Sequence, residues 1–122
     1  MKGARDLCAL DDLEPGRLTE LALPSGSSVV IVRTGDGVRV FAAVCPHRGG
    51  PLARGRVRPD VSSAPDCPRD RIVDRTRLLL TCPWHNWEFD LDAGGLALYD
   101  SRRVRVYESS VVDGRVLASV PA

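Results

Sequence analysis

The sequence predicts an all-β protein with an antiparallel β-sandwich or barrel. Several short segments alternate apolar and polar residues with the period of two that is typical of half-buried strands. Clusters of glycine, proline and aspartate separate these segments at close intervals. No stretch shows apolar residues repeating every three to four positions, as an amphipathic helix would. These three observations together favour the all-β class.

The N-terminal third contains one clear candidate hairpin. Residues 7–28 are interpreted as a lead-in segment with turns at Glu14–Gly16 and Pro24–Gly26. The next run is apolar, rich in β-branched residues and too short for a helix, which favours a strand. A Gly-Asp-Gly turn at 35–37 leads into a second alternating run. Residues 29–43 are therefore predicted to form a β-hairpin.

The C-terminal part predicts further strands separated by turns. Aspartate and glycine mark turns at 92–95 and 113–114, and the second of these is typical of a tight hairpin. The segments around these turns have apolar residues at alternate positions. Strands are accordingly expected over residues 78–81, 87–91, 103–108 and 115–120.

Residues 53–77 interrupt this rhythm. They hold seven arginines, four aspartates and three prolines, with a net charge of +3. Loops longer than about 12–15 residues in compact domains tend to be functional or disordered. We interpret the segment as a long polar loop inserted between the two flanking parts of the chain. It is either a solvent-exposed insertion without a role or a docking surface for an acidic partner.

Length and charge exclude several classes of protein. The 122 residues suit a single domain, predicted to span 1–122. A net charge of +1 argues against sequence-independent nucleic-acid binding, which needs a basic excess. No apolar run approaches the roughly 20 residues of a membrane span. The first residues have no apolar stretch of the kind found in signal peptides, so a cytoplasmic location is expected.

Two short motifs combine cysteine with histidine. Cys45-Pro-His47 and Cys82-Pro-Trp-His85 each follow an apolar strand end and use both histidines of the chain. Two thiolates and two imidazoles suit Zn²⁺ or an iron–sulfur cluster. Zinc fingers pair two cysteines in one half of the site and two histidines in the other, whereas each motif here contains one cysteine and one histidine. This mixing fits a site in which the cysteines hold one iron and the histidines the other, and zinc stays an alternative.

These motifs resemble those of the Rieske iron–sulfur family. The sequences CPHRGGPL from Cys45 and CPWH from Cys82 are close to the family's two ligand loops around a 2Fe–2S cluster. The resemblance implies that Cys45 and Cys82 ligate the inner iron, and that His47 and His85 ligate the outer one. It also implies a Rieske fold, in which a small cluster-binding subdomain joins the β-sandwich, with the long insertion lying between the two loops.

Four positions narrow the subtype that the resemblance implies. High-potential respiratory members carry an extra cysteine in each loop, joined as a disulfide, where this chain has Gly50 and Trp84. Those members also have serine and tyrosine hydroxyls that hydrogen-bond the cluster or its ligand, where this chain has Trp87 and Phe89. Hydrogen bonds to cluster sulfur raise the potential. The substitutions therefore predict a potential near the low end of the Rieske range, about −150 mV.

The same resemblance implies an electron carrier rather than an enzyme. Rieske oxygenases add a mononuclear iron site with two further histidines and a carboxylate, and this chain has no further histidine. We therefore expect a Rieske ferredoxin that passes electrons from a reductase to a terminal oxygenase. The alternatives are the small Rieske subunit of an NAD(P)H-dependent nitrite reductase, bound to its large subunit, and a zinc-bound interaction module. Cys8 and Cys67 are interpreted as thiols without a role.

Overall fold

A computed structural model describes residues 4–34, 37–46, 49–63, 71–83, 87–92, 95–98 and 102–120, with side chains throughout except at 58–63 and 71–77. The described strands form three antiparallel sheets, and no α-helix occurs among these residues. The all-β, antiparallel prediction is confirmed. No helix in this part of the chain is long and apolar enough to cross a membrane.

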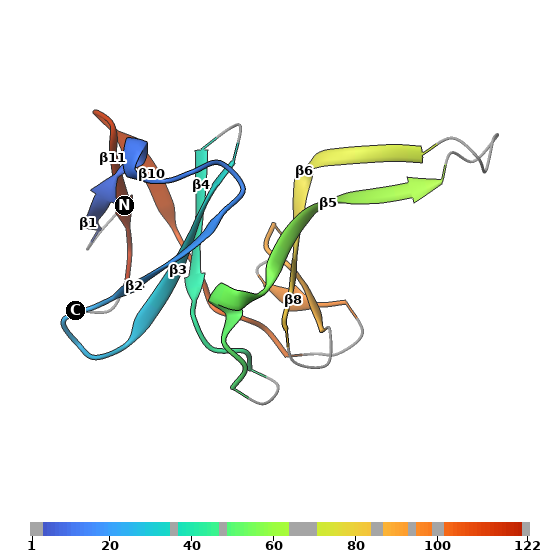
Figure 1. Ribbon diagram of the computed structural model, residues 1–122, viewed down its shortest axis with the longest axis horizontal. Coiled ribbons are helices and arrows are strands. Elements are labelled where there is room, and N and C mark those ends of the chain that lie inside the picture. Colours follow the sequence, from blue (N-terminus) through green and yellow to red (C-terminus); the bar gives the residue numbers. More distant parts are fainter. Residues whose placement is uncertain are drawn as a thin grey trace.

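The three sheets differ in where they lie in the molecule. Figure 1 shows the first two side by side and the third set apart, with the hairpin of β5 and β6 extending away from the other sheets. Two short 3₁₀ turns, η1 and η2, connect strands at Leu10–Asp12 and Leu52–Arg54. The first sheet has the order β1 (Arg5–Ala9), β11 (Arg115–Ala118), β10 (Ser109–Val112). The second has the order β2 (Leu18–Ala22), β3 (Ser28–Thr34), β4 (Gly37–Ala42), β9 (Val106–Tyr107). The third has the order β5 (Arg56–Ser63), β6 (Arg71–Thr81), β7 (Glu88–Asp90), β8 (Leu96–Ala97).

Strand β3 separates two hydrophobic cores. Four consecutive residues of this strand, Val29 to Val32, are at most 1% exposed. Successive side chains of a strand point to opposite faces, and here they alternate between the two core clusters: Val29 and Ile31 enter one, and Val30 and Val32 the other. The continuous apolar run is therefore explained by burial on both faces. The hairpin predicted over 29–43 is confirmed by the full register of β3 with β4.

The lead-in segment contains more structure than its sequence indicated. The sequence predicts a lead-in segment with two turns over residues 7–28, and most of β1 and all of β2 also lie there. β1 pairs with β11 near the other end of the chain, and β2 pairs with β3. In neither strand do apolar and polar residues alternate regularly. The position of each strand in its sheet therefore depends on the strand it pairs with, and not on its own residue pattern. In the C-terminal part, only Val106–Tyr107 of the strand expected over 103–108 forms a paired strand, β9.

The prediction of a long loop over 53–77 is wrong for most of its length. Residues 56–63 and 71–77 belong to the paired strands β5 and β6, and 64–70 lie outside the described residues. The sequence suggested a loop partly because of Pro59, which has no N–H to give to a sheet. Its register explains how the strand tolerates it: Pro59 pairs with Leu78, but Asp60 pairs with Asp74, so the ladder shifts at the proline. The assignment of 1–122 to a single domain stays a prediction.

Candidate metal centre

The first cysteine motif begins a short loop that is closed by its own backbone. Cys45 lies just after β4, where it is 3% exposed. Its N–H donates to the carbonyl of Gly50 at 2.9 Å, and its carbonyl accepts from the N–H of Gly49 at 2.9 Å. Gly49 has φ +76°, a conformation that glycine adopts without strain. These contacts bring the two ends of the 45–50 segment together, with Cys45 on the buried side.

The second cysteine motif has the same construction. Cys82 directly follows β6 and is fully buried. Its N–H donates to the carbonyl of Trp87 at 2.8 Å, and β7 begins one residue later. Each cysteine is therefore the first residue of a backbone-closed loop at the end of a strand. His47 and His85 belong to these two loops in sequence, but both lie outside the described residues.

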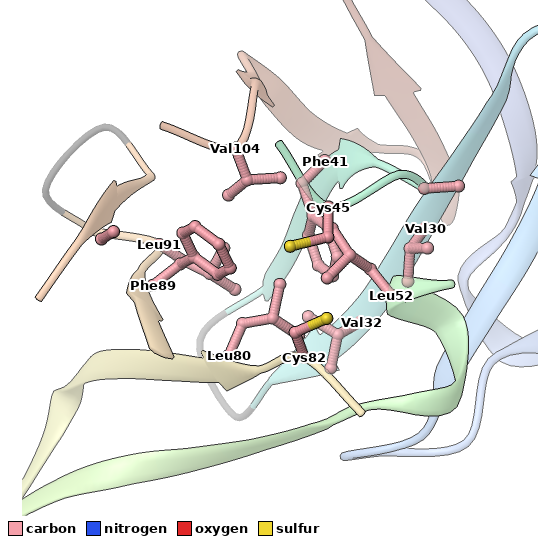
Figure 2. Packing of buried hydrophobic residues seen from close by; sticks show 12 residues of the cluster. Val30, Val32, Phe41, Cys45, Leu52, Leu80, Cys82, Phe89, Leu91 and Val104 are labelled. Atoms are coloured by element: carbon pink, nitrogen blue, oxygen red, sulfur yellow. The ribbon is translucent and has the colours of Figure 1, made fainter. Parts of the chain in front are cut away.

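Both thiols enter one hydrophobic cluster, although they come from different sheets. Figure 2 shows Cys45 and Cys82 together with Phe41, Leu80 and Phe89 in this cluster. Both are thiols rather than disulfides, as is the partly buried Cys8. Two buried thiols from separate loops fit a soft metal centre, because thiolates are the ligands that iron–sulfur clusters and zinc prefer. The surrounding apolar side chains keep water from the cysteine end of such a site.

Close backbone contacts hold the two loops in place. Leu52, fully buried at the start of η2, donates its N–H to the carbonyl of Ala43 at 3.0 Å, which ties η2 to the segment before Cys45. Gly55 then lies so close to Thr81 that a Cβ on Gly55 would collide with the carbonyl oxygen of Thr81. The segment from η2 into β5 therefore connects the two cysteines. Nothing in the sequence around Gly55 marks it as a position where two backbone segments approach closely.

Aromatic side chains follow the second loop. Phe89 is fully buried, and the ring of the partly buried Trp87 lies 6.3 Å from it, centroid to centroid. The guanidinium carbon of Arg102 lies over the Trp87 ring, 5.6 Å from its centroid. Phe89 belongs to the cluster that contains both cysteines, Trp87 packs against it, and neither ring carries a hydroxyl group. Trp87 and Phe89 stand out in the sequence because they follow the second motif directly, whereas Arg102 does not, because its partner is fifteen positions away in the chain.

Comparison with known proteins identifies the family. A family model described as the Rieske [2Fe-2S] domain matches residues 4–108. The chain belongs to the Rieske [2Fe-2S] domain family. Its cofactor is a Rieske-type 2Fe–2S cluster, in which two irons are held by two cysteines and two histidines. The two buried thiols, Cys45 and Cys82, fit the cysteine half of this ligand set.

Three relatives show how this Rieske domain is used elsewhere. The carnitine monooxygenase oxygenase subunit of Acinetobacter baumannii is 36% identical over 89 residues, which cover 66% of this chain but 19% of that protein. The chain thus spans less than a fifth of that relative. The methanesulfonate monooxygenase ferredoxin subunit of Methylosulfonomonas methylovora is 27% identical over 93% of this chain and 78% of its own length. A solved structure from Mycobacterium tuberculosis, described as a proposed NADH-dependent nitrite reductase small subunit, is 29% identical with a TM-score of 0.72, covering 98% of this chain and 96% of its own.

Proposed function

We propose that this Rieske protein is a single-electron carrier that passes electrons from a reductase to a terminal oxygenase. In this proposal Cys45 and Cys82 ligate the inner iron, and His47 and His85 the outer one. The observation that carries it is the burial of both thiols in one core, each at the start of a backbone-closed loop whose sequence contains one histidine. When bound, the cluster supplies a one-electron redox centre.

The residues of this chain then determine how readily an electron is accepted. Two ferric ions, two sulfides and two thiolates with neutral imidazoles carry no net charge, so reduction leaves one negative charge beside an apolar core. That charge is costly to bury without hydrogen-bond donors. Trp87 and Phe89 supply no hydroxyl donor. The proposal therefore includes a low potential, as suits a carrier that donates onward.

The histidines of these 122 residues suffice for the cluster alone. A mononuclear iron site of the kind that activates oxygen needs two histidines and a carboxylate. The chain has only His47 and His85, and the proposed cluster uses both. The ferredoxin subunit from Methylosulfonomonas, which matches over most of its length, supports the same role. We also propose a cytoplasmic location, where thiols such as that of Cys8 remain reduced.

A second candidate function is the small subunit of a nitrite reductase. It is favoured by the Mycobacterium structure, which matches this chain over nearly the full length of both proteins. The two candidates differ in how permanent the partner is. A carrier purifies alone, whereas a subunit purifies with a large protein that contains flavin or haem. Affinity purification from the native host, followed by absorption spectra of the eluate, distinguishes them.

The electron paramagnetic resonance spectrum of the dithionite-reduced protein tests the proposed cluster, with metal analysis on the same sample. A rhombic signal of low average g and two irons per chain are expected. Cys45→Ser and Cys82→Ser are expected to lose the signal, whereas Cys8→Ser keeps it because Cys8 lies in the other core. A silent sample with one zinc per chain would instead support the zinc-bound interaction module and remove the electron-transfer function.

A further inference from the structure

A small basic cavity opens beside the second cysteine. Its volume is about 230 Å³, enough for the carboxylate of an aspartate or glutamate side chain. Two of the residues that line it are arginines, and none is acidic among the described residues. The lining residues are Arg54, Gly55, Arg56, Thr81, Cys82 and Pro83.

The fold itself brings the two arginines to this place. Arg56 pairs directly with Thr81 in the ladder of β5 and β6, one residue before Cys82. The missing side chain of Gly55 lets the backbone approach the carbonyl of Thr81, which draws the flanking Arg54 toward the same strand end. The strand register, the glycine contact and the cavity therefore agree in placing two arginine residues next to the strand end that carries Cys82.

We propose that this cavity is a docking point for a carboxylate on the surface of the redox partner. The inference rests on the proposed electron-transfer function and adds the chemistry of the partner: an acidic side chain close to its own redox centre. Guanidinium groups match carboxylates in geometry and charge. Pro83, at the cavity's edge, leads into the segment that contains His85. A carboxylate bound here holds the partner against the loop proposed to carry the outer iron's ligand.

The exposure of the two arginines favours a partner protein over a free anion. Arg54 and Arg56 are both exposed. Exposed charge pairs gain little in water and are screened by salt, so a small free anion is held weakly. A carboxylate that belongs to a protein surface is supported by the rest of the interface. Electron-transfer encounters are small and steered by charge, which is the regime in which two well-placed arginines matter most.

The test uses two electron donors of opposite charge with the cluster-loaded protein. Reduced flavodoxin serves as the acidic protein donor, and the methyl viologen radical cation as a small cationic donor. Stopped-flow rates are measured over a series of salt concentrations for the wild type, Arg54→Glu/Arg56→Glu and the matched control Arg5→Glu/Arg17→Glu, which changes the net charge by the same amount. Arg5 on β1 and Arg17 beside β2 are exposed, and both strands belong to different sheets from the cavity. The reduction potential of each variant corrects for changes in driving force.

The proposal predicts a specific pattern. The double variant reacts with flavodoxin at low salt about tenfold more slowly than the wild type and loses most of its salt dependence. Its rate with the viologen cation is unchanged or faster, and Arg5→Glu/Arg17→Glu retains most of the wild-type rate with flavodoxin. If the double variant does not bind its cluster, Arg54→Gln/Arg56→Gln replaces it, with a smaller loss in the same direction and Arg5→Glu alone as the control of equal charge change.

Three results would overturn the proposal. One is an equal loss with Arg5→Glu/Arg17→Glu and with the double variant of the cavity, which means that only net charge matters. Another is an unchanged flavodoxin rate in the double variant. The third is a pair of results. Inorganic phosphate at constant ionic strength inhibits the wild type but not the double variant, and the two proteins react with flavodoxin at equal rates in phosphate-free buffer. This pair would mean that the cavity binds a free anion only. A wild-type protein that accepts electrons from neither donor would instead contradict the electron-transfer function itself.

Discussion

Arg39 and Asp92 form an ion pair that joins the two sheets leading to the cysteines. Arg39 Nε donates to Asp92 Oδ1 at 2.9 Å, and both side chains are less than a quarter exposed. The other oxygen of Asp92 accepts the backbone N–H of Leu78 at 2.8 Å. Arg39 lies on β4, which precedes Cys45, and Leu78 lies on β6, which precedes Cys82. One carboxylate therefore fixes the relative position of the two strands.

Asp92→Ala is expected to lower the free energy of unfolding by about 2 kcal/mol, because it removes two charge-assisted hydrogen bonds from a half-buried position. The thermal midpoint of the cluster-loaded protein, followed by visible absorption, measures the effect. Asp6→Ala is the matched control. It breaks the Asp6–Arg115 pair, whose side chains are about half exposed, and is expected to cost much less than Asp92→Ala because water screens the pair.

A double-mutant cycle with Arg39→Gln isolates the ion pair. The losses from Asp92→Ala and Arg39→Gln are expected to be non-additive by at least about 0.5 kcal/mol, since the two side chains are in direct contact. Strict additivity would show that the carboxylate acts through the N–H of Leu78 alone.

Gly55→Ala is expected to damage the cluster site rather than the conformation of its own backbone. Gly55 has φ −78°, which any residue adopts, so alanine introduces no backbone strain there. Its Cβ instead collides with the carbonyl oxygen of Thr81, and relief of this collision displaces the neighbouring Cys82. We expect a loss of about 1–3 kcal/mol in stability and faster release of iron. Iron content and the rate of bleaching by a chelator measure the effect.

Gly26→Ala provides the contrasting control. Gly26 has φ +93°, and no atom lies within 4 Å of the Cβ that alanine would add. Its substitution costs about 1–2 kcal/mol through backbone strain, with normal iron content. If both variants retained iron equally, the Gly55–Thr81 contact would not support the site.

Elements whose partners lie next to them in the chain were predictable from the sequence. The hairpin over 29–43 has a turn between two apolar runs, and the hairpin of β10 and β11 follows from Asp113-Gly114. Asp113 has φ +51° and Gly114 has φ +74°, as a tight turn of this kind requires. The two cysteine motifs are local as well, and the structure places both of their thiols in one core, whereas their role as cluster ligands stays a prediction.

Elements that depend on distant partners were not predictable. β1 pairs with β11 across almost the whole chain, and a mixed segment such as Arg5–Ala9 carries no signal of that pairing. In residues 53–77, the many charged residues and prolines favour a loop, and the strand pairing becomes visible only in the register of β5 with β6. The contact between Gly55 and Thr81 is likewise a matter of backbone approach, which sequence spacing does not report.

The thiol of Cys8 is expected to react slowly at neutral pH. Burial, and to a smaller extent the carboxylate of Asp12, raise the pKa of Cys8 above its ordinary value of 9.0, although Arg115 opposes the shift. Since the folded state binds the proton more tightly, this contribution to stability is fully present below pH 9 and is lost as the pH rises through the folded pKa. The pH dependence of iodoacetamide alkylation in a Cys67→Ser background is expected to have its midpoint above 9. A midpoint below that value would contradict the prediction.

Phe89→Tyr is expected to raise the reduction potential. Phe89 is fully buried in the cluster that contains Cys45 and Cys82, at the position where high-potential relatives are expected to have tyrosine. A new hydroxyl that donates to sulfur stabilises the added electron. A net hydrogen bond is worth about 0.5–1.5 kcal/mol, which corresponds to about 20–65 mV for a one-electron couple. Phe89→Leu is the matched control, since it changes packing without adding a donor. A redox titration in which tyrosine and leucine shift the potential equally would show that the hydroxyl does not reach a ligand sulfur.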